Sequence, residues 1–99
     1  MVNIAGKRGS LFELNCLLLA TPGVVDGIIF EPPTEDTMGR LAALVVAPEL
    51  SSREAMANIR AHVDPVFIPR RVIFVDSLPR SETGKLPREQ VLAQFRAGT

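Results

Sequence analysis

The sequence has few of the features that mark secreted, membrane-spanning or nucleic-acid-binding proteins. Of its 99 residues only Cys16 is a cysteine, so no internal disulfide can form, and a reducing compartment such as the cytoplasm is expected. No window holds the roughly 20 apolar residues that a membrane span needs, and the N-terminal segment does not have the pattern of a signal peptide. Eleven basic and eleven acidic residues give zero formal net charge, which argues against nucleic acid or an anionic membrane as the main partner.

The sequence also lacks the spacing of Cys, His, Asp and Glu that is typical of metal ligands, so no intrinsic metal site is expected. Cys16 lies in an apolar run, and we interpret it as a core residue rather than a nucleophile. His62 falls late in an expected helix, which favours a surface or helix-terminal role. Asp26 and Asp76 stand at the ends of expected strands, which favours turn or cap roles.

What is present is an alternation of apolar segments and turn signals that suits one domain over residues 1–99. The first ten residues predict a hairpin around Gly6 and Gly9. Segment 31–39, with two prolines, predicts a loop. Helices are expected over 10–20, 52–63 and 87–95, and strands over 24–30, 41–47 and 71–75. This order predicts an α+β domain: a small mixed, mostly antiparallel three-stranded sheet flanked by helices and preceded by the hairpin.

Capping residues support the predicted starts of the first two helices. Ser10 with Glu13, and Ser51 with Glu54, have the spacing of a capping box at the first two helices.

The five phenylalanines fall at apolar, core-like or turn positions. An RNA-binding domain of the ferredoxin-like type uses exposed strand aromatics and positive charge, and this sequence is expected to have neither.

The segment from Leu78 to Arg88 carries the strongest chemical signal. Its Thr-Gly-Lys resembles the end of a phosphate-binding P-loop, but that motif needs a glycine five residues before Gly84, where a proline stands. Gly84 tolerates unusual backbone dihedrals and close approach to a ligand. Lys85 is then a long, mobile point charge that can reach a site built by another domain. Such a charge suits a carboxylate attacking an α-phosphate, because it positions two anions and stabilises the charge that develops.

The stretch from Pro79 to Arg88 resembles the C-terminal signature of AMP-forming ligases, a family of acyl-CoA synthetases, peptide-synthetase adenylation domains and luciferases. Their loop reads Pro-Arg-(Ser/Thr)-x-(Ser/Thr)-Gly-Lys-(Leu/Ile)-x-Arg, and this sequence matches it throughout. The resemblance implies that Lys85 is the adenylation lysine. It also implies that Ser81, Thr83 and Gly84 shape the loop that carries it.

A second match to the same family lies near the N-terminus. The family has Gly-x-(Arg/Lys), then a Glu-Ile-Glu-like helix, then His-Pro-x-Val. The corresponding segments here are Gly6-Lys7-Arg8, Glu13-Leu14-Asn15 and Thr21-Pro22-Gly23-Val24. The Pro69 segment and the strand after it are also similar to the family, so the resemblance covers nearly the whole chain and is closest to an acyl-CoA synthetase.

The sequence departs from the family at three positions. Asn3 stands where lysine is usual, Gly9 where an aliphatic residue is usual, and Asn15 where a second glutamate is usual. The family's hinge residue, an aspartate or lysine, should lie just before Met1. We therefore expect residues 1–99 to be an excised C-terminal domain that acts as a mobile cap.

The resemblance implies a part of an enzyme, an ATP-dependent, AMP-forming carboxylic acid ligase of the acyl-CoA or acyl-carrier-protein type. Lys85 faces the site first, while the carboxylic acid and ATP, with Mg²⁺, give acyl-AMP and pyrophosphate. After a domain rotation, the face with Gly6, Lys7 and Arg8 helps to guide the thiol of coenzyme A or phosphopantetheine. The implied partners are the large N-terminal adenylation domain of the same chain, the acid, and coenzyme A or an acyl carrier protein. The domain alone is expected to bind no cofactor tightly and to be inactive.

Other interpretations stay open at this point. Lys85 can be a solvated loop lysine, and Lys7 with Arg8 can be a charged hairpin tip. Arg88 is expected to lie on a helix surface or at a domain interface rather than to act in catalysis. The alternative function is a stand-alone α+β binding or regulatory module whose basic loops hold an anionic ligand or a protein.

Overall fold

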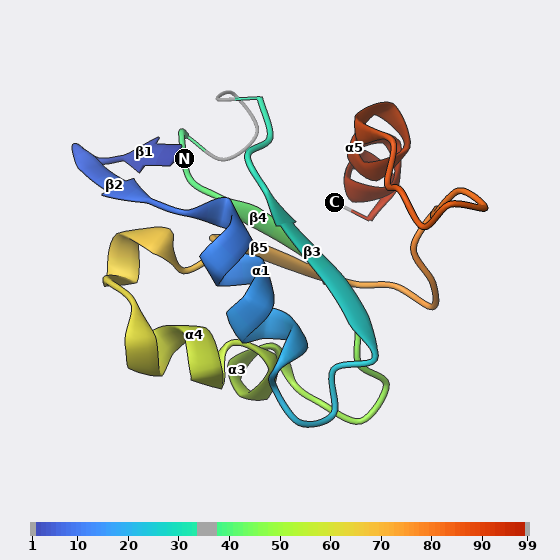
Figure 1. Cartoon of the computed structure of the whole chain (residues 1–99), viewed down its shortest axis with the longest axis horizontal. Coiled ribbons are helices and arrows are strands. Elements are labelled where there is room, and N and C mark those ends of the chain that lie inside the picture. Colours follow the sequence, from blue (N-terminus) through green and yellow to red (C-terminus); the bar gives the residue numbers. More distant parts are fainter. Residues whose placement is uncertain (1, 34–37, 99) are drawn as a thin grey trace.

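The computed structural model describes residues 2–33 and 38–98, so residues 34–37 of the expected loop lie outside the described part of the chain. A short hairpin precedes a three-stranded sheet that has helices on both faces (Figure 1). The elements, in chain order, are β1 (Val2–Ile4), β2 (Lys7–Gly9), α1 (Leu11–Leu19), β3 (Asp26–Phe30), β4 (Ala42–Val46), α3 (Ser52–Ala55), α4 (Ala57–His62), a 3-10 turn (Pro65–Phe67), β5 (Arg71–Phe74) and α5 (Arg88–Ala97). None of the helices in the described ranges is long and apolar enough to cross a bilayer.

The sheet has the order β3-β4-β5, with β3 antiparallel and β5 parallel to the central strand. Leu44, in the middle of β4, pairs with Ile28 on one side and Ile73 on the other. A strand that is buried on both faces reads as a continuous apolar run, which explains the composition of residues 41–47. The predicted hairpin and mixed sheet are confirmed.

Two apolar cores lie on opposite faces of the sheet. One face packs against α1, α3 and α4 through a core that includes Leu14, Leu18 and Ile59. The other face packs against α5 through Val91 and Phe95. Successive β4 side chains alternate between the two cores, as a strand requires. Figure 1 shows the result, with α5 standing apart from the other helices.

The hairpin turns through two residues, Ala5 and Gly6, whose φ angles are 52° and 81°. Positive φ at both positions is the type I′ geometry that suits a two-residue hairpin. Gly9 lies at the end of β2 rather than in the turn. A Cβ there would meet the Phe67 ring at 2.7 Å, so this ring fills the space beside Gly9.

The helix predicted over 52–63 is divided in two. Ser51 and Glu54 form a reciprocal capping box, with backbone-to-side-chain hydrogen bonds of 3.0 and 3.2 Å, and α3 ends after one turn. Met56 separates α3 from α4 with φ −95° and ψ −1°, and its side chain is buried in the core. The apolar spacing from Met56 to Ile59 continues across the break, so periodicity did not reveal it.

The interpretation of Cys16 as a core residue is wrong, because its side chain is exposed. Helix α1 buries Leu14 and Leu18, and a residue two positions away points about 200° around the helix. Phe12, also two positions from Leu14, is 80% exposed, so it is not a core residue either. Phe74 on β5 is 41% exposed, so the expectation that the strands carry no exposed aromatic residue is wrong at this position. The helical spacing of Leu14 and Leu18 correctly predicts the buried face, and Cys16 lies off that face although its neighbours are apolar.

Candidate functional site

The predicted lysine loop connects β5 to α5 and closes on itself through backbone hydrogen bonds. The Ser81 N–H donates to the Lys85 carbonyl at 2.8 Å, and the Gly84 N–H donates to the Ser81 carbonyl at 2.9 Å. Gly84 has φ +83°, in the left-handed region that costs little only for glycine. The loop is therefore a tight turn whose geometry depends on a glycine directly before Lys85.

The hydroxyl groups of Ser81 and Thr83 make further hydrogen-bond contacts inside this turn. Ser81 Oγ accepts a hydrogen bond from the Lys85 N–H at 3.2 Å and lies 3.0 Å from Thr83 Oγ1. Both side chains are exposed, so their hydroxyl groups serve the loop rather than the core. On either side of the loop, Leu78 and Leu86 pack against the core beneath α5 and hold its ends in place.

Lys85 is exposed at this turn. Within residues 2–33 and 38–98, no carboxylate lies at salt-bridge distance from its ammonium group. The lysine is thus a cation presented on a shaped loop. This is the arrangement expected of a group that acts in a site built by another domain.

Arg80 ties the loop to the sheet. Its Nε and Nη2 donate to the two carboxylate oxygens of Asp26 at 2.8 and 2.7 Å, and its Nη1 donates to the Gly84 carbonyl at 2.9 Å. The Arg80 guanidinium lowers the pKa of Asp26, and burial partly opposes that shift. Asp26 also accepts from the Gly27 N–H at 2.8 Å, but both residues belong to strand β3, so the expected turn or cap role is wrong. Its pairing with a residue 54 positions away had no signal in the sequence.

The hairpin residues predicted for the thiol side lie in a second charged region. The Lys7 ammonium pairs with Asp64, and it lowers the pKa of that carboxyl group. Asp64 also caps the 3-10 turn by accepting from the Val66 N–H at 3.0 Å. Arg8 is exposed on the neighbouring strand position. Lys7 is therefore held by the fold, while Arg8 projects from it.

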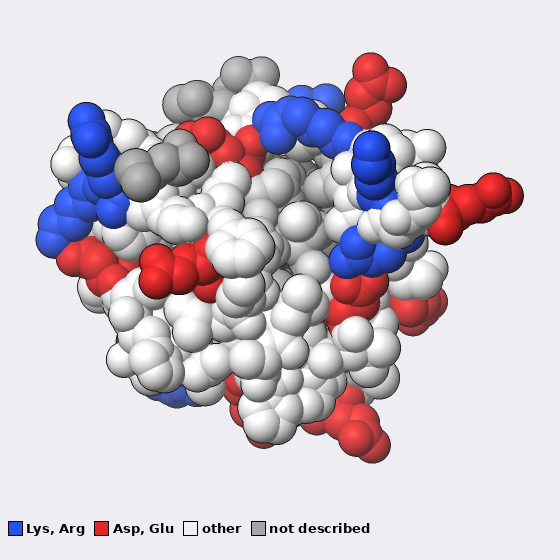
Figure 2. Space-filling view, viewed as in Figure 1, with Lys and Arg blue, Asp and Glu red and all other residues white. Residues whose placement is uncertain are grey.

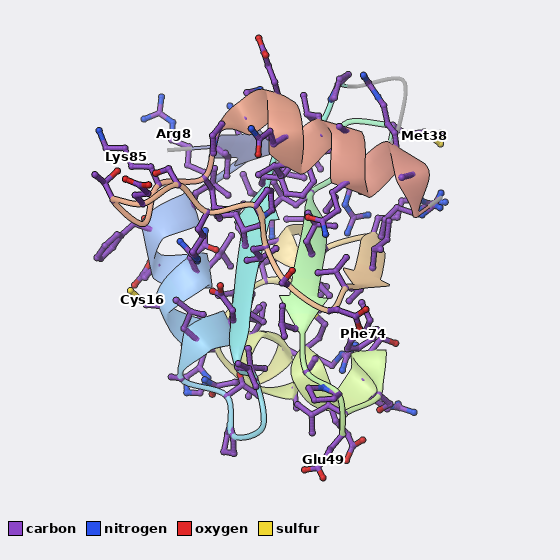
Figure 3. The ribbon with its side chains drawn as sticks, turned by 90° about the vertical axis from the view of Figure 1, so that its right-hand side faces the viewer. Arg8, Cys16, Met38, Glu49, Phe74 and Lys85 are labelled. Carbon is purple, nitrogen blue, oxygen red and sulfur yellow. The ribbon has the colours of Figure 1, made fainter. Side chains whose placement is uncertain are left out.

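The structure does not bring the two predicted groups together. The molecule is 35 Å long, and the hairpin and the lysine loop lie at opposite ends of this axis (Figure 1). Basic side chains stand at both of these ends in the space-filling view (Figure 2). Figure 3 looks along the same axis, so Arg8 and Lys85 lie near one another in projection although they come from the two ends of the molecule. One domain thus presents two separate charged ends.

Comparison with known proteins assigns this fold to a family. The family model described as "AMP-binding enzyme C-terminal domain" matches residues 13–85, a range that ends at Lys85. The chain belongs to this family. The match covers most of the AMP-binding C-terminal domain seen here, and it leaves out the hairpin and α5.

Curated relatives of the domain are much longer proteins. The domain is 29% identical over 104 residues to the 3-hydroxybenzoate–CoA ligase of Aromatoleum sp. (strain CIB), and the aligned region covers 99% of this chain and 20% of that protein. It is 30% identical over 101 residues to the acetyl-coenzyme A synthetase of Methanothrix soehngenii, covering 95% and 15%. The chain therefore spans about a fifth or less of the length of these relatives.

Solved structures show the same fold. The Mycobacterium tuberculosis fatty acyl CoA synthetase matches with a TM-score of 0.81 and 26% identity over 98% of this chain and 20% of that one. MatB from Rhodopseudomonas palustris matches with a TM-score of 0.78 and 24% identity over 96% and 20%. The predicted α+β architecture and the family resemblance are confirmed.

The AMP-binding C-terminal domain has one further feature that sequence reasoning missed. A cavity of about 570 Å³ is lined by four arginines and by no acidic residue. These are Arg53, Arg60, Arg70 and Arg71. None of them lies at salt-bridge distance from a carboxylate in the described part of the chain. Zero net charge concealed this local excess, and only the adjacent Arg70 and Arg71 gave a sequence signal for it.

Arg88 and His62, two further residues considered in the sequence analysis, lie next to backbone carbonyl groups. Arg88 donates through Nη2 to the Glu31 carbonyl at 2.8 Å and stands at the start of α5. His62 is exposed at the end of α4, with Nδ1 2.8 Å from the Asn58 carbonyl. Among the described residues, no group of three or more His, Cys, Asp or Glu side chains is placed to hold a metal ion.

Proposed function

We propose that this domain is the mobile C-terminal part of an ATP-dependent, AMP-forming carboxylic acid–CoA ligase, and that Lys85 is its adenylation lysine. The observation that carries the proposal is the exposed ammonium group of Lys85 on a self-closed loop that also bears the family's signature. Family membership and relatives named as CoA ligases support it.

The proposed first step joins two anions. A carboxylate oxygen of the acid attacks the α-phosphorus of ATP, a new O–P bond forms, and the bond to pyrophosphate breaks. Negative charge shifts onto the phosphoryl oxygens as this happens. An ammonium group that contacts both the carboxylate and the α-phosphate holds them together and stabilises that charge.

The remaining parts of this site belong to the large N-terminal adenylation domain of the same chain. Since this domain spans about a fifth of its relatives, the pockets for ATP and the acid are proposed to lie outside it. The Mg²⁺ that accompanies ATP is proposed to bind there as well. We place the reaction in the cytoplasm, where ATP and coenzyme A are available.

In the proposed second step, the thiol gives up its proton to solvent and its sulfur attacks the acyl carbonyl. A C–S bond forms, the C–O bond to the phosphate breaks, and AMP leaves. The separation of the hairpin from the lysine loop supports a rotation that exchanges one end for the other at the active site. The cavity with four arginines supports coenzyme A as the acceptor, because its nucleotide carries several phosphates whereas phosphopantetheine carries one.

The central test is acid-dependent ATP–pyrophosphate exchange in the complete ligase, comparing wild type with Lys85→Ala. We expect exchange to fall about a hundredfold or more, as for the loss of one charge-stabilising donor. Thioester formation from pre-made acyl-AMP should stay near wild type. Glu82→Ala, on the same exposed loop, is the matched control and should leave both reactions unchanged. Unchanged exchange in Lys85→Ala would refute the role of the lysine and favour an anion-binding module.

A second arm tests the thiol acceptor. Arg60→Gln should raise KM for coenzyme A by about tenfold, because a hydrogen bond to a charged group contributes about 1.5–3 kcal/mol. Pyrophosphate exchange should not change. With pantetheine, which lacks the phosphates, the wild type and the variant should react alike. An equal KM for coenzyme A in both proteins would exclude this cavity from acceptor binding.

A further inference from the structure

Arg80 contacts three acceptors with one planar group. Two of its nitrogens meet the two oxygens of the Asp26 carboxylate, and the third meets the Gly84 carbonyl. A guanidinium group has this fork of donors in a fixed geometry, which makes such contacts directional. The contacts therefore join the edge strand β3 to the lysine loop in a defined orientation.

The Gly84 carbonyl belongs to the same planar peptide unit as the nitrogen of Lys85. Holding this carbonyl therefore sets the orientation of the backbone from which the lysine side chain starts. The bonds within the loop set its shape but do not link it to the sheet. The packing of Leu78 and Leu86 holds the ends of the loop and leaves its tip to be oriented by another contact.

We propose that Arg80 and Asp26 are positioning residues for Lys85: together they orient the Gly84–Lys85 peptide so that the ammonium group meets its target. This inference rests on the proposed function of Lys85. Neither Arg80 nor Asp26 needs to contact the acid or ATP. Their effect on the reaction passes entirely through the lysine.

If the Arg80–Asp26 ion pair only stabilised the fold, its removal would change stability and not specifically the adenylation step. The side chains of Arg80 and Asp26 are 37% and 27% exposed, and pairs near the surface contribute about 1 kcal/mol or less to folding. Removing the pair should therefore leave the domain folded. Misplacing a reacting group by about 1 Å can cost up to a hundredfold in rate, so the loss should appear in the adenylation step.

The experiment uses the complete ligase with Arg80→Gln, Arg80→Lys and Asp26→Asn. We expect kcat for pyrophosphate exchange to fall about tenfold or more in Arg80→Gln, with KM for ATP and acid within about twofold of wild type. Thioester formation from acyl-AMP should not change. Arg80→Lys should fail to rescue, because a lysine cannot span the carboxylate and the carbonyl together. Glu89→Gln, an exposed residue in the first turn of α5, is the control and should behave as wild type.

A double variant separates positioning from direct contact with substrate. If Arg80 acts through Lys85, then Arg80→Gln should add no further loss in a Lys85→Ala background. Losses that multiply in the double variant would overturn the inference, and so would full rescue by Arg80→Lys or equal losses in both half-reactions. A large effect of Lys85→Ala with none from Arg80→Gln would refute the positioning role alone. No effect of Lys85→Ala would refute the proposed function itself.

Discussion

Asn15 joins helix α1 to the outer edge of the sheet, and its replacement gives a direct test of how this edge is stabilised. Its Nδ2 donates to the Leu11 carbonyl at 2.8 Å and to the Ile29 carbonyl at 3.1 Å. Its Oδ1 accepts from the Ile29 N–H at 2.8 Å. Because β3 is an outer strand, the Asn15 amide takes the place of a neighbouring strand for both backbone groups of Ile29.

The magnitude of the loss follows from these bonds. Asn15→Ala leaves two backbone groups of Ile29 without this partner, and because both are only partly buried each should cost the lower end of about 1–3 kcal/mol, or about 2–3 kcal/mol in total. The higher helix propensity of alanine offsets at most about 0.7 kcal/mol of this loss. We therefore expect a net loss of about 1–2 kcal/mol. For a domain of this size each kcal/mol lowers Tm by about 4–8 °C.

The assay is urea unfolding followed by far-UV circular dichroism, with the m-value compared between proteins to confirm that only stability changed. Asn3→Ala is the control, since Asn3 is exposed on β1 and its replacement should change stability by less than about 0.5 kcal/mol. Asn15→Asp keeps the acceptor and loses the donors, so it should be less stable than wild type at neutral pH and recover partly when its carboxyl group is protonated. If Asn15→Ala were as stable as the control, water would be replacing the amide and the reasoning would be refuted.

Three further outcomes are expected. Phe95→Ala should destabilise the domain by about 3–5 kcal/mol in the same unfolding assay, because the ring is buried and lies edge-on to Phe30 with centroids 5.4 Å apart. The lowered pKa of Asp26 means that its contribution is present above the ordinary aspartate value of about 3.9 and is lost as pH falls through its lower folded value. The stability difference between wild type and Arg80→Gln, measured by unfolding midpoints, should therefore be constant above about pH 4 and shrink below it. The exposed thiol of Cys16, which points away from the sheet in Figure 3, should react with a thiol reagent in the folded protein at a rate close to that of the unfolded chain.

The sequence by itself determined the features that depend on neighbours along the chain. Ser51 and Glu54 form the reciprocal cap that their spacing predicts, because a capping box needs only one turn of helix. The apolar run over residues 41–47 contains strand β4, as predicted, and its apolar side chains on both faces suit a strand that is covered on both sides. The signature around Lys85 is a closed turn, because Gly84 and the two hydroxyl residues act within five positions of one another.

Only the tertiary structure decided the features that depend on residues far apart in the sequence. Cys16 is exposed because α1 packs on the sheet through Leu14 and Leu18, and the apolar neighbours of Cys16 in sequence do not share that face. Arg80 meets Asp26 across 54 positions, and the arginine cavity gathers side chains from two separate segments. Periodicity and composition report which residues prefer burial, whereas the pairing of distant polar groups is set by how the elements pack. For this reason the motif around Lys85 could be recognised in the sequence, whereas the contacts of Arg80 with Asp26 and the Gly84 carbonyl are seen only in the fold.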